Sequence, residues 1–111
     1  MVTPRALTRG EVWLVELDPT VGSEIRKTRP CVIVSPDAIH NNIRTVLIVP
    51  LTSGSRPAPA RVDVQFAGVK GFIMVEQIRA IDRLRLVKKL GILDGPTLSK
   101  TLKTLQILFT E

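Results

Sequence analysis

The chain has 111 residues, enough for one hydrophobic core but not for two domains. Its content of 44% hydrophobic and 23% charged residues excludes a disordered tail, and no apolar run approaches the roughly 20 residues that cross a bilayer. Sixteen Lys and Arg against ten Asp and Glu give a net charge of +6, which is typical either of a nucleic-acid-binding domain or of a basic surface kept for solubility. With no secretory signal visible at the start, we expect a single cytoplasmic domain over residues 1–111.

Short β-rich runs, each stopped by Pro, Gly or Asp, dominate most of the chain. Residues 1–9 have no periodicity and are expected to form an extended lead-in. The runs that follow predict strands at 12–17, 31–34, 45–49, 61–65, 72–75, 77–81 and 85–92. The segments 72–75 and 77–81 are either two strands or one bent strand. Two polar segments, 18–27 and 51–59, are predicted to be exposed loops.

The apolar period changes near the C-terminus and predicts a helix over 94–110. The residues that share one face of this helix are Leu98, Leu102, Leu105 and Phe109. Asp94 or Thr97 is expected to cap its start. Short strands with tight turns, followed by one helix, predict a mainly β fold, either a small barrel or a strongly curled antiparallel sheet with the helix over its open side.

Single residues exclude several kinds of site. With Cys31 as the one cysteine, the chain cannot form an internal disulfide or a cysteine-based zinc site. With His40 as the one histidine, two-histidine metal sites and two-histidine nuclease pairs are also excluded. We expect Cys31 to be a core thiol and His40 to lie on the surface. The chain has no Tyr and only four other aromatic residues, which argues against a multi-base stacking platform.

The first candidate site is the basic segment that leads into the second predicted strand. It holds Arg26, Lys27 and Arg29 close to Glu24, and Pro30 restricts the preceding arginine to an extended conformation. A guanidinium held in this way is suited to gripping a phosphate with two hydrogen bonds. The alternative is a solvated charged loop that simply feeds a strand.

The second candidate site follows the third predicted strand, where Thr52 and Ser53 place two adjacent hydroxyls. Hydroxyl groups at the end of a strand are held in place by a rigid scaffold, which suits them to a functional site. The alternative is an ordinary turn, in which Ser and Thr are common.

Several separated segments together resemble the MazF/PemK family of toxin endoribonucleases, from type II toxin–antitoxin systems. In chain order they read Gly-Glu-Val-Trp at 10–13, Asp-Pro-Thr-Val-Gly-Ser-Glu at 18–24, Arg-Pro at 29–30, Val-Ile-Val-Ser-Pro at 32–36, Val-Pro-Leu-Thr at 49–52 and Glu-Gln-Ile-Arg-Ala-Ile-Asp at 76–82. The resemblance implies an SH3-like small barrel of about six or seven short strands with a C-terminal helix (MazF/CcdB-like), usually as a homodimer. One departure is the segment 25–28, which stands where relatives often carry a Gly-rich stretch.

The same resemblance implies a sequence-specific endoribonuclease that cleaves single-stranded RNA without a metal or another cofactor. Attack by the 2′-hydroxyl would leave a 2′,3′-cyclic phosphate and a 5′-hydroxyl. The catalytic residues implied by the family are Arg29 and Thr52, with Glu24 also in the site and the general base left open. The residues expected to contact RNA are Lys27, Arg26, Ser53 and Gln77.

The implied partners are single-stranded RNA and an acidic, partly disordered antitoxin that would occupy the RNA groove. A basic surface suits such an antitoxin electrostatically. Two alternatives share the fold: a CcdB-like toxin that binds DNA gyrase, and a paralogue that only binds RNA or an antitoxin. Fold alone does not separate them, because function depends on the site.

Overall fold

The computed structural model describes residues 6–17, 27–54 and 56–111. Its elements in chain order are β1 (Glu11–Glu16), β2 (Thr28–Ile33), α1 (Asp37–His40), β3 (Thr45–Thr52), β4 (Arg61–Phe66), β5 (Val69–Met74), the 3₁₀ turn η1 (Val75–Gln77), β6 (Arg79–Asp82), the 3₁₀ turn η2 (Arg83–Arg85), β7 (Leu86–Ile92) and α2 (Gly95–Leu108). The segment left open in the sequence is therefore two strands, β5 and β6, separated by η1. Within the described ranges no helix is long and apolar enough to cross a membrane.

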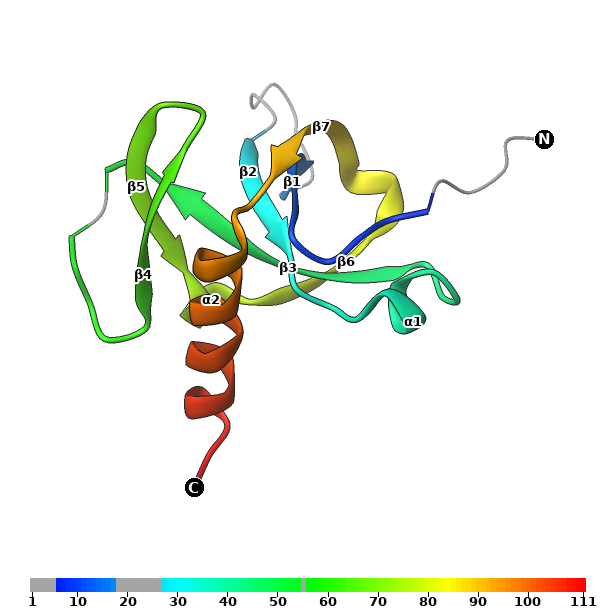
Figure 1. The fold of residues 1–111 in the computed structure, drawn as a ribbon. Helices are drawn as coiled ribbons and strands as arrows, with labels where there is room; N and C mark the ends of the chain where they lie inside the picture. The colour runs from blue at the N-terminus through cyan, green and yellow to red at the C-terminus, as the bar shows by residue number, and fades with distance from the viewer. Residues whose placement is uncertain (1–5, 18–26, 55) are drawn as a thin grey trace.

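The strands form one curled antiparallel sheet in the order β4-β5-β3-β2-β1-β7, with β6 beside β3 (Figure 1). One edge of β3 pairs with β2, while its other edge pairs first with β6 and then, from Leu51 onward, with β5. This change of partner turns the β4–β5 hairpin away from the rest of the sheet and gives a half-barrel. The predicted fold class, a small mainly β fold with a C-terminal helix, is confirmed.

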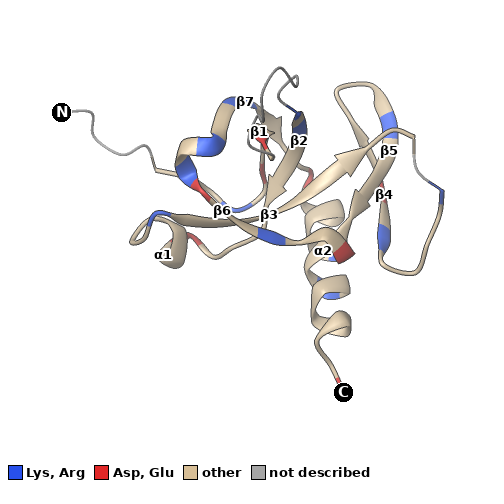
Figure 2. Cartoon of the chain, turned by 180° about the vertical axis from the view of Figure 1, so that it is seen from behind, with Lys and Arg blue, Asp and Glu red and all other residues tan. Residues whose placement is uncertain are grey.

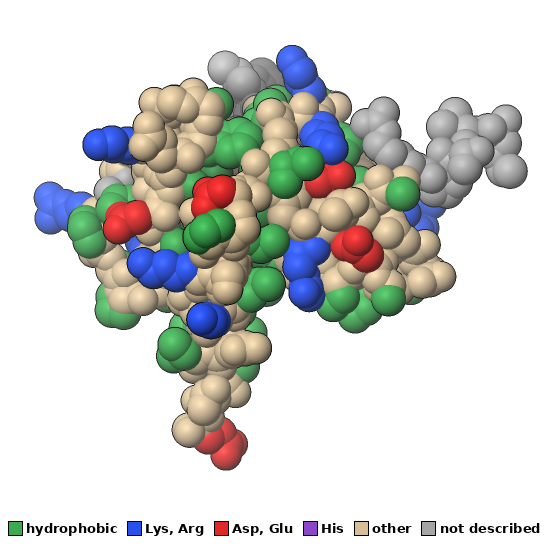
Figure 3. Space-filling view, in the orientation of Figure 1, with side chains coloured by type: hydrophobic (Ala, Val, Ile, Leu, Met, Phe, Trp, Pro, Cys, Tyr) green, Lys and Arg blue, Asp and Glu red, His purple; other side chains and the backbone are tan. Residues whose placement is uncertain are grey.

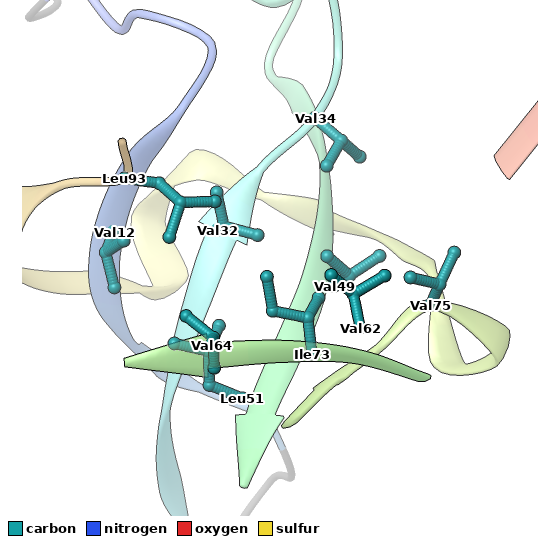
Figure 4. Close-up of a cluster of buried hydrophobic side chains, with 10 residues drawn as sticks. All are labelled: Val12, Val32, Val34, Val49, Leu51, Val62, Val64, Ile73, Val75 and Leu93. Atoms are coloured by element: carbon teal, nitrogen blue, oxygen red, sulfur yellow. The ribbon is translucent and has the colours of Figure 1, made fainter. Parts of the chain in front are cut away.

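Side chains of the central strands are buried on both faces of the sheet, which explains why their sequences read as continuous apolar runs. In β2, Val32 points into one core cluster, whereas Cys31 and Ile33 point into the other. Because successive residues of a strand face opposite sides, β1 and β3 divide in the same way. Figure 4 shows the first cluster, in which side chains of β1 to β3 meet those of β4 and β5.

Helix α2 closes the first cluster. The Asp94 carboxylate caps it by accepting from the backbone N–H of Thr97 at 3.0 Å, so Asp94 is the cap of the two that were expected. The leucines of the predicted face pack on the core: Leu98, Leu102 and Leu105. Phe109, the fourth residue of that face, is 75% exposed, because the helix ends at Leu108 and its last turn extends past the sheet (Figure 1).

The expectation that His40 lies on the surface is wrong. Its side chain is fully buried, with Nδ1 2.8 Å from the Ser35 hydroxyl and Nε2 2.7 Å from the carbonyl oxygen of Leu7. The histidine thus ties the segment before β1 to the connection between β2 and β3. Periodicity could not reveal this role, because both partners are distant in sequence or outside regular elements.

Candidate functional site

The candidate site lies where β2 and β3 separate. The two strands pair through Cys31 and Pro50, and this register, continued by two residues, sets Arg29 opposite Thr52. No pair joins β2 and β3 beyond this one within the described residues, while the other edge of β3 passes from β6 to β5. Pro30 and Pro50 stand at this divide, and neither has an N–H to donate between strands. The two predicted catalytic residues therefore lie on opposite sides of one opening, Arg29 on β2 and Thr52 on β3. These two sides are called the lips of the opening below.

A pocket of about 480 Å³ fills this opening, between β2, the end of β3, the β4–β5 hairpin and β7. Its polar lining comes from Thr28, Arg29, Thr52, Ser53 and Lys70. Its apolar lining comes from Pro30, Leu51, Val64, Phe66, Ala67, Val69 and Leu90. Figure 3 shows apolar side chains at the surface between the hairpin and the rest of the molecule. The described lining of this pocket thus offers two cations and three hydroxyls beside an apolar wall, a combination that suits a nucleotide.

The Arg29 backbone is fixed although its side chain is exposed. It lies opposite Val15 of β1, and the following Pro30 restricts it to an extended conformation. Arg29 therefore borders the pocket from a rigid strand. Among the described residues that line the pocket, Lys70 is the other basic one. Figure 2 shows basic residues on β2 and on β5.

Thr52 is held from two directions. Its hydroxyl oxygen accepts the backbone N–H of Gly54 at 3.3 Å, which orients the side chain and leaves the hydroxyl proton to be donated. Its carbonyl lies against Gly71 of β5, where a Cβ would collide with the carbonyl oxygen and lie 3.0 Å from the carbonyl carbon. The absence of a side chain at this glycine lets β3 and β5 approach closely at the site.

Cys31 is next to the site but is not part of its chemistry. Its thiol is fully buried in the second core cluster, as the sequence predicted. Burial raises the pKa of Cys31 to about 12, against a smaller opposing effect of the Arg29 and Arg79 charges. The thiolate that would be needed for a nucleophile is therefore absent at neutral pH.

The structure brings three of the predicted site residues into one pocket: Arg29, Thr52 and Ser53. Lys27 is exposed immediately before β2, outside the pocket lining. Gln77 lies in η1, where its amide donates to the Met74 sulfur at 3.6 Å and to Glu76, and it does not line the pocket. Glu24 and Arg26 lie outside the described residues. The roles of all seven residues stay predictions.

Sequence reasoning missed the contribution of the β4–β5 hairpin. Phe66 and Lys70 line the pocket, although the sequence indicated only a strand and a turn there. The alternation of residues 61–65 correctly gave the strand. Nothing in it placed the hairpin beside Arg29, because that proximity depends on β3 changing partners.

The family that this chain resembles is also found by direct comparison. Residues 8–109 match the sequence model of the PemK-like, MazF-like toxin of type II toxin-antitoxin system. The chain is 42% identical over 81 residues to Endoribonuclease PemK of Escherichia coli, an alignment covering 68% of this chain and 61% of that protein. It is 31% identical over 105 residues to Endoribonuclease EndoA of Bacillus subtilis (strain 168), covering 89% and 90% of the two.

Solved structures agree with these matches at the level of the fold. The MazE–MazF structure (Form-II) from Deinococcus radiodurans superposes with a TM-score of 0.82 at 23% identity, covering 95% of this chain and 96% of that chain. A mycobacterial endoribonuclease in complex with its cognate antitoxin superposes with a TM-score of 0.76 at 24% identity, covering 92% and 93%. With 102 of its 111 residues spanned by the family match, the chain belongs to the PemK-like, MazF-like toxins of type II toxin–antitoxin systems.

Proposed function

We propose that the protein is a toxin endoribonuclease that cleaves single-stranded RNA at short specific sequences. The observation that carries the proposal is the placement of Arg29 and Thr52 on opposite lips of one pocket. Family membership supports it, since the relatives described above are named endoribonucleases.

The proposed reaction is a transesterification within the substrate. The 2′-oxygen attacks the adjacent phosphorus, the bond to the 5′-oxygen breaks, and a 2′,3′-cyclic phosphate and a 5′-hydroxyl result. The 2′-hydroxyl loses one proton and the 5′-oxygen gains one, so the step consumes no water and calls for no metal ion or other cofactor.

The proposal assigns to residues of the pocket the stabilisation that the transition state of this reaction needs. Negative charge grows on the non-bridging oxygens of the phosphorane, and preorganised donors stabilise it. The Arg29 guanidinium provides the charge and two parallel N–H groups. The Thr52 hydroxyl donates a further hydrogen bond to a non-bridging oxygen. Glu24 is proposed to belong to the same site, and the proposal assigns no residue as the base for the 2′-hydroxyl.

The apolar wall of the pocket favours binding of a nucleotide over binding of a free phosphate. Phe66, Val69 and Leu90 line the same opening as the polar groups. An aromatic ring beside aliphatic side chains is a favourable surface for a base from an unpaired strand. Lys27, Arg26, Ser53 and Gln77 are proposed to make further contacts with the RNA.

The proposed protein partners are a second copy of the chain and an acidic antitoxin, acting in the cytoplasm. Complexes named MazE–MazF support the antitoxin, and the net charge of +6 suits an acidic segment. The proposed dimer surface centres on β7, which is an edge strand with exposed apolar residues. Their exposed fractions are 55% for Val87, 40% for Leu90 and 67% for Ile92.

The deciding experiment is cleavage of a long single-stranded RNA in excess EDTA, with the ends of the products identified. We expect the wild type to cut at a recurring short sequence and to leave 2′,3′-cyclic phosphates. Arg29→Ala and Thr52→Val, which remove the charge and only the hydroxyl respectively, should each reduce kcat/KM by about 100-fold or more.

Lys103→Ala is the matched control, because it removes an exposed cation from α2 and should leave the rate unchanged. Wild-type rates in Arg29→Ala would rule out the proposed site. A folded wild type that cuts none of several diverse RNAs would favour the gyrase-binding or binding-only alternatives.

A further inference from the structure

A second cleft adjoins the pocket on the outer face of the β4–β5 hairpin. It also measures about 480 Å³, and its lining includes Ser53, Asp63, Gln65, Lys70, Gly71 and Phe72. Four residues line both cavities: Ser53, Val64, Lys70 and Gly71. The two cavities are therefore contiguous along the end of β3, immediately beyond Thr52.

Strand register sets the chemistry of this cleft. Asp63 lies opposite Phe72 and Gln65 lies opposite Lys70 across the hairpin, so directly paired residues share a face. Asp63 and Gln65 are two positions apart in β4 and so face the same side. Their neighbours Val62 and Val64 belong to the first core cluster on the opposite side. One outward face thus carries a carboxylate, an amide, an ammonium group and an aromatic ring.

These polar groups are available to a ligand. Throughout the ranges that the structure describes, the Asp63 carboxylate, the Gln65 amide and the Lys70 ammonium group have no hydrogen-bond or ion-pair partner, and all three side chains are exposed. Phe72 is half-buried, so its ring is held in place by the fold while one part stays accessible. The polar groups of the cleft are therefore not occupied by other side chains of the described residues.

We propose that this cleft binds the nucleobase next to the scissile phosphate and selects adenine or cytosine, whose amino groups N6 and N4 stand where guanine and uracil carry a carbonyl oxygen. The proposal rests on the proposed nuclease function, because the first pocket supplies the position of the phosphate. A carboxylate accepts a hydrogen bond from an amino group, and Gln forms paired hydrogen bonds with adenine. Uracil has carbonyl oxygens at its edge instead of an amino group and would face the carboxylate unfavourably.

The arrangement of charges favours a base over other occupants. The carboxylate of Asp63 repels a phosphate, so the backbone of the RNA is directed to Lys70, which borders both cavities. Phe72 offers a surface on which any base stacks, and stacking on an aromatic ring is a main source of single-strand affinity. A basic side chain of a protein partner would also suit this carboxylate, and the test below treats that occupant as an outcome against the inference.

The test maps sequence preference with a randomised single-stranded RNA pool in two parallel measurements. The first measurement sequences the cleavage products. The second uses a 2′-O-methyl RNA pool of the same design, which cannot be cleaved, and sequences the RNA that the protein retains. The variants are Asp63→Asn and Gln65→Leu, with Glu111→Gln as the control that removes a remote exposed carboxylate. The thermal unfolding midpoint of each variant verifies that it is folded.

The wild type and Glu111→Gln should prefer adenine or cytosine by about tenfold or more at one fixed position beside the cut. Asp63→Asn and Gln65→Leu should lose about tenfold of that preference at this position alone. Lys70→Met should instead weaken binding evenly across sequences and reduce its dependence on salt. The same position should stand out in the 2′-O-methyl pool.

Three outcomes would overturn the inference. They are an unchanged preference in both cleft variants, a wild-type preference for uracil at the adjoining position, and a change of antitoxin affinity without a change of RNA preference. Failure of the nuclease proposal looks different: no RNA is cut, while the preference in the 2′-O-methyl pool and its loss in the variants still support the cleft.

Discussion

Gly71 controls the position of Thr52 although it has no side chain of its own. The backbone of β3 passes so close to this glycine that a Cβ there would collide with the Thr52 carbonyl oxygen and lie 3.2 Å from the Cα of Ser53. Because both obstacles are backbone atoms, neither can rotate away. The end of β3, with the hydroxyls of Thr52 and Ser53, would have to move.

Gly71→Ala is therefore expected to reduce kcat/KM for RNA by about 100-fold, since displacements near 1 Å in a reacting site have effects of this size. Gly95→Ala serves as the matched control, because a Cβ at the start of α2 would meet no atom within 4 Å. Cleavage of a defined RNA by both variants, with circular dichroism to verify folding, provides the measurement. Full activity in Gly71→Ala would show that the strand end tolerates displacement.

Among the elements, β1 and β7 are joined by an ion pair at the border of the sheet. Glu11 is 6% exposed and accepts the indole N–H of Trp13 at 2.9 Å, while its other oxygen lies 3.2 Å from the Lys89 ammonium group. Burial alone would raise the pKa of Glu11, but the hydrogen bonds from Trp13 and Lys89 outweigh it and hold that pKa below its usual value of 4.5.

A lowered pKa in the folded state means that the ionised carboxylate stabilises the protein above pH 4.5 and that this contribution is lost as the pH falls further. Glu11→Gln should therefore lower the free energy of unfolding by about 1 kcal/mol at neutral pH. Below about pH 4 the difference from wild type should shrink. Urea denaturation across this pH range measures it. Parallel loss of stability in both proteins would assign the acid sensitivity to other carboxylates.

At the scale of the whole molecule, the half-barrel leaves β7 at one end of the sheet. Its apolar side chains Val87 and Ile92 are more than half exposed, and β1 is the one strand that pairs with it in the described ranges. An apolar edge of this kind is a liability for a monomer unless another chain covers it.

We expect the protein to have twice the chain mass of 12.3 kDa in light scattering, as the proposed homodimer requires. Val87→Lys combined with Ile92→Lys should shift it toward the mass of one chain, because each substitution would place a charge in the apolar contact. Ile107→Lys, at an equally exposed position near the end of α2, is the comparison that should stay dimeric. A wild type of single-chain mass would contradict the proposed dimer.

The sequence determined the elements whose signal is local. Continuous β-branched runs predicted β2 and β3, because strands buried on both faces need apolar residues at every position. The spacing of Leu98, Leu102 and Leu105 predicted the packed face of α2, since that periodicity belongs to a helix whatever it packs against. The family resemblance carried by the Arg-Pro and Pro-Leu-Thr segments pointed to Arg29 and Thr52, and both line one pocket.

Only the tertiary structure decided how these elements meet. The β4–β5 hairpin lies beside Arg29 because β3 changes partner at Leu51, and the burial of His40 depends on Leu7, 33 residues away. Such contacts join positions that share no local period, so no pattern within either segment encodes them. Sequence therefore specified the strands, the helix and the two lips of the pocket. The fold supplied Phe66, Lys70 and the adjoining cleft, because packing between distant segments creates the cavity that they line.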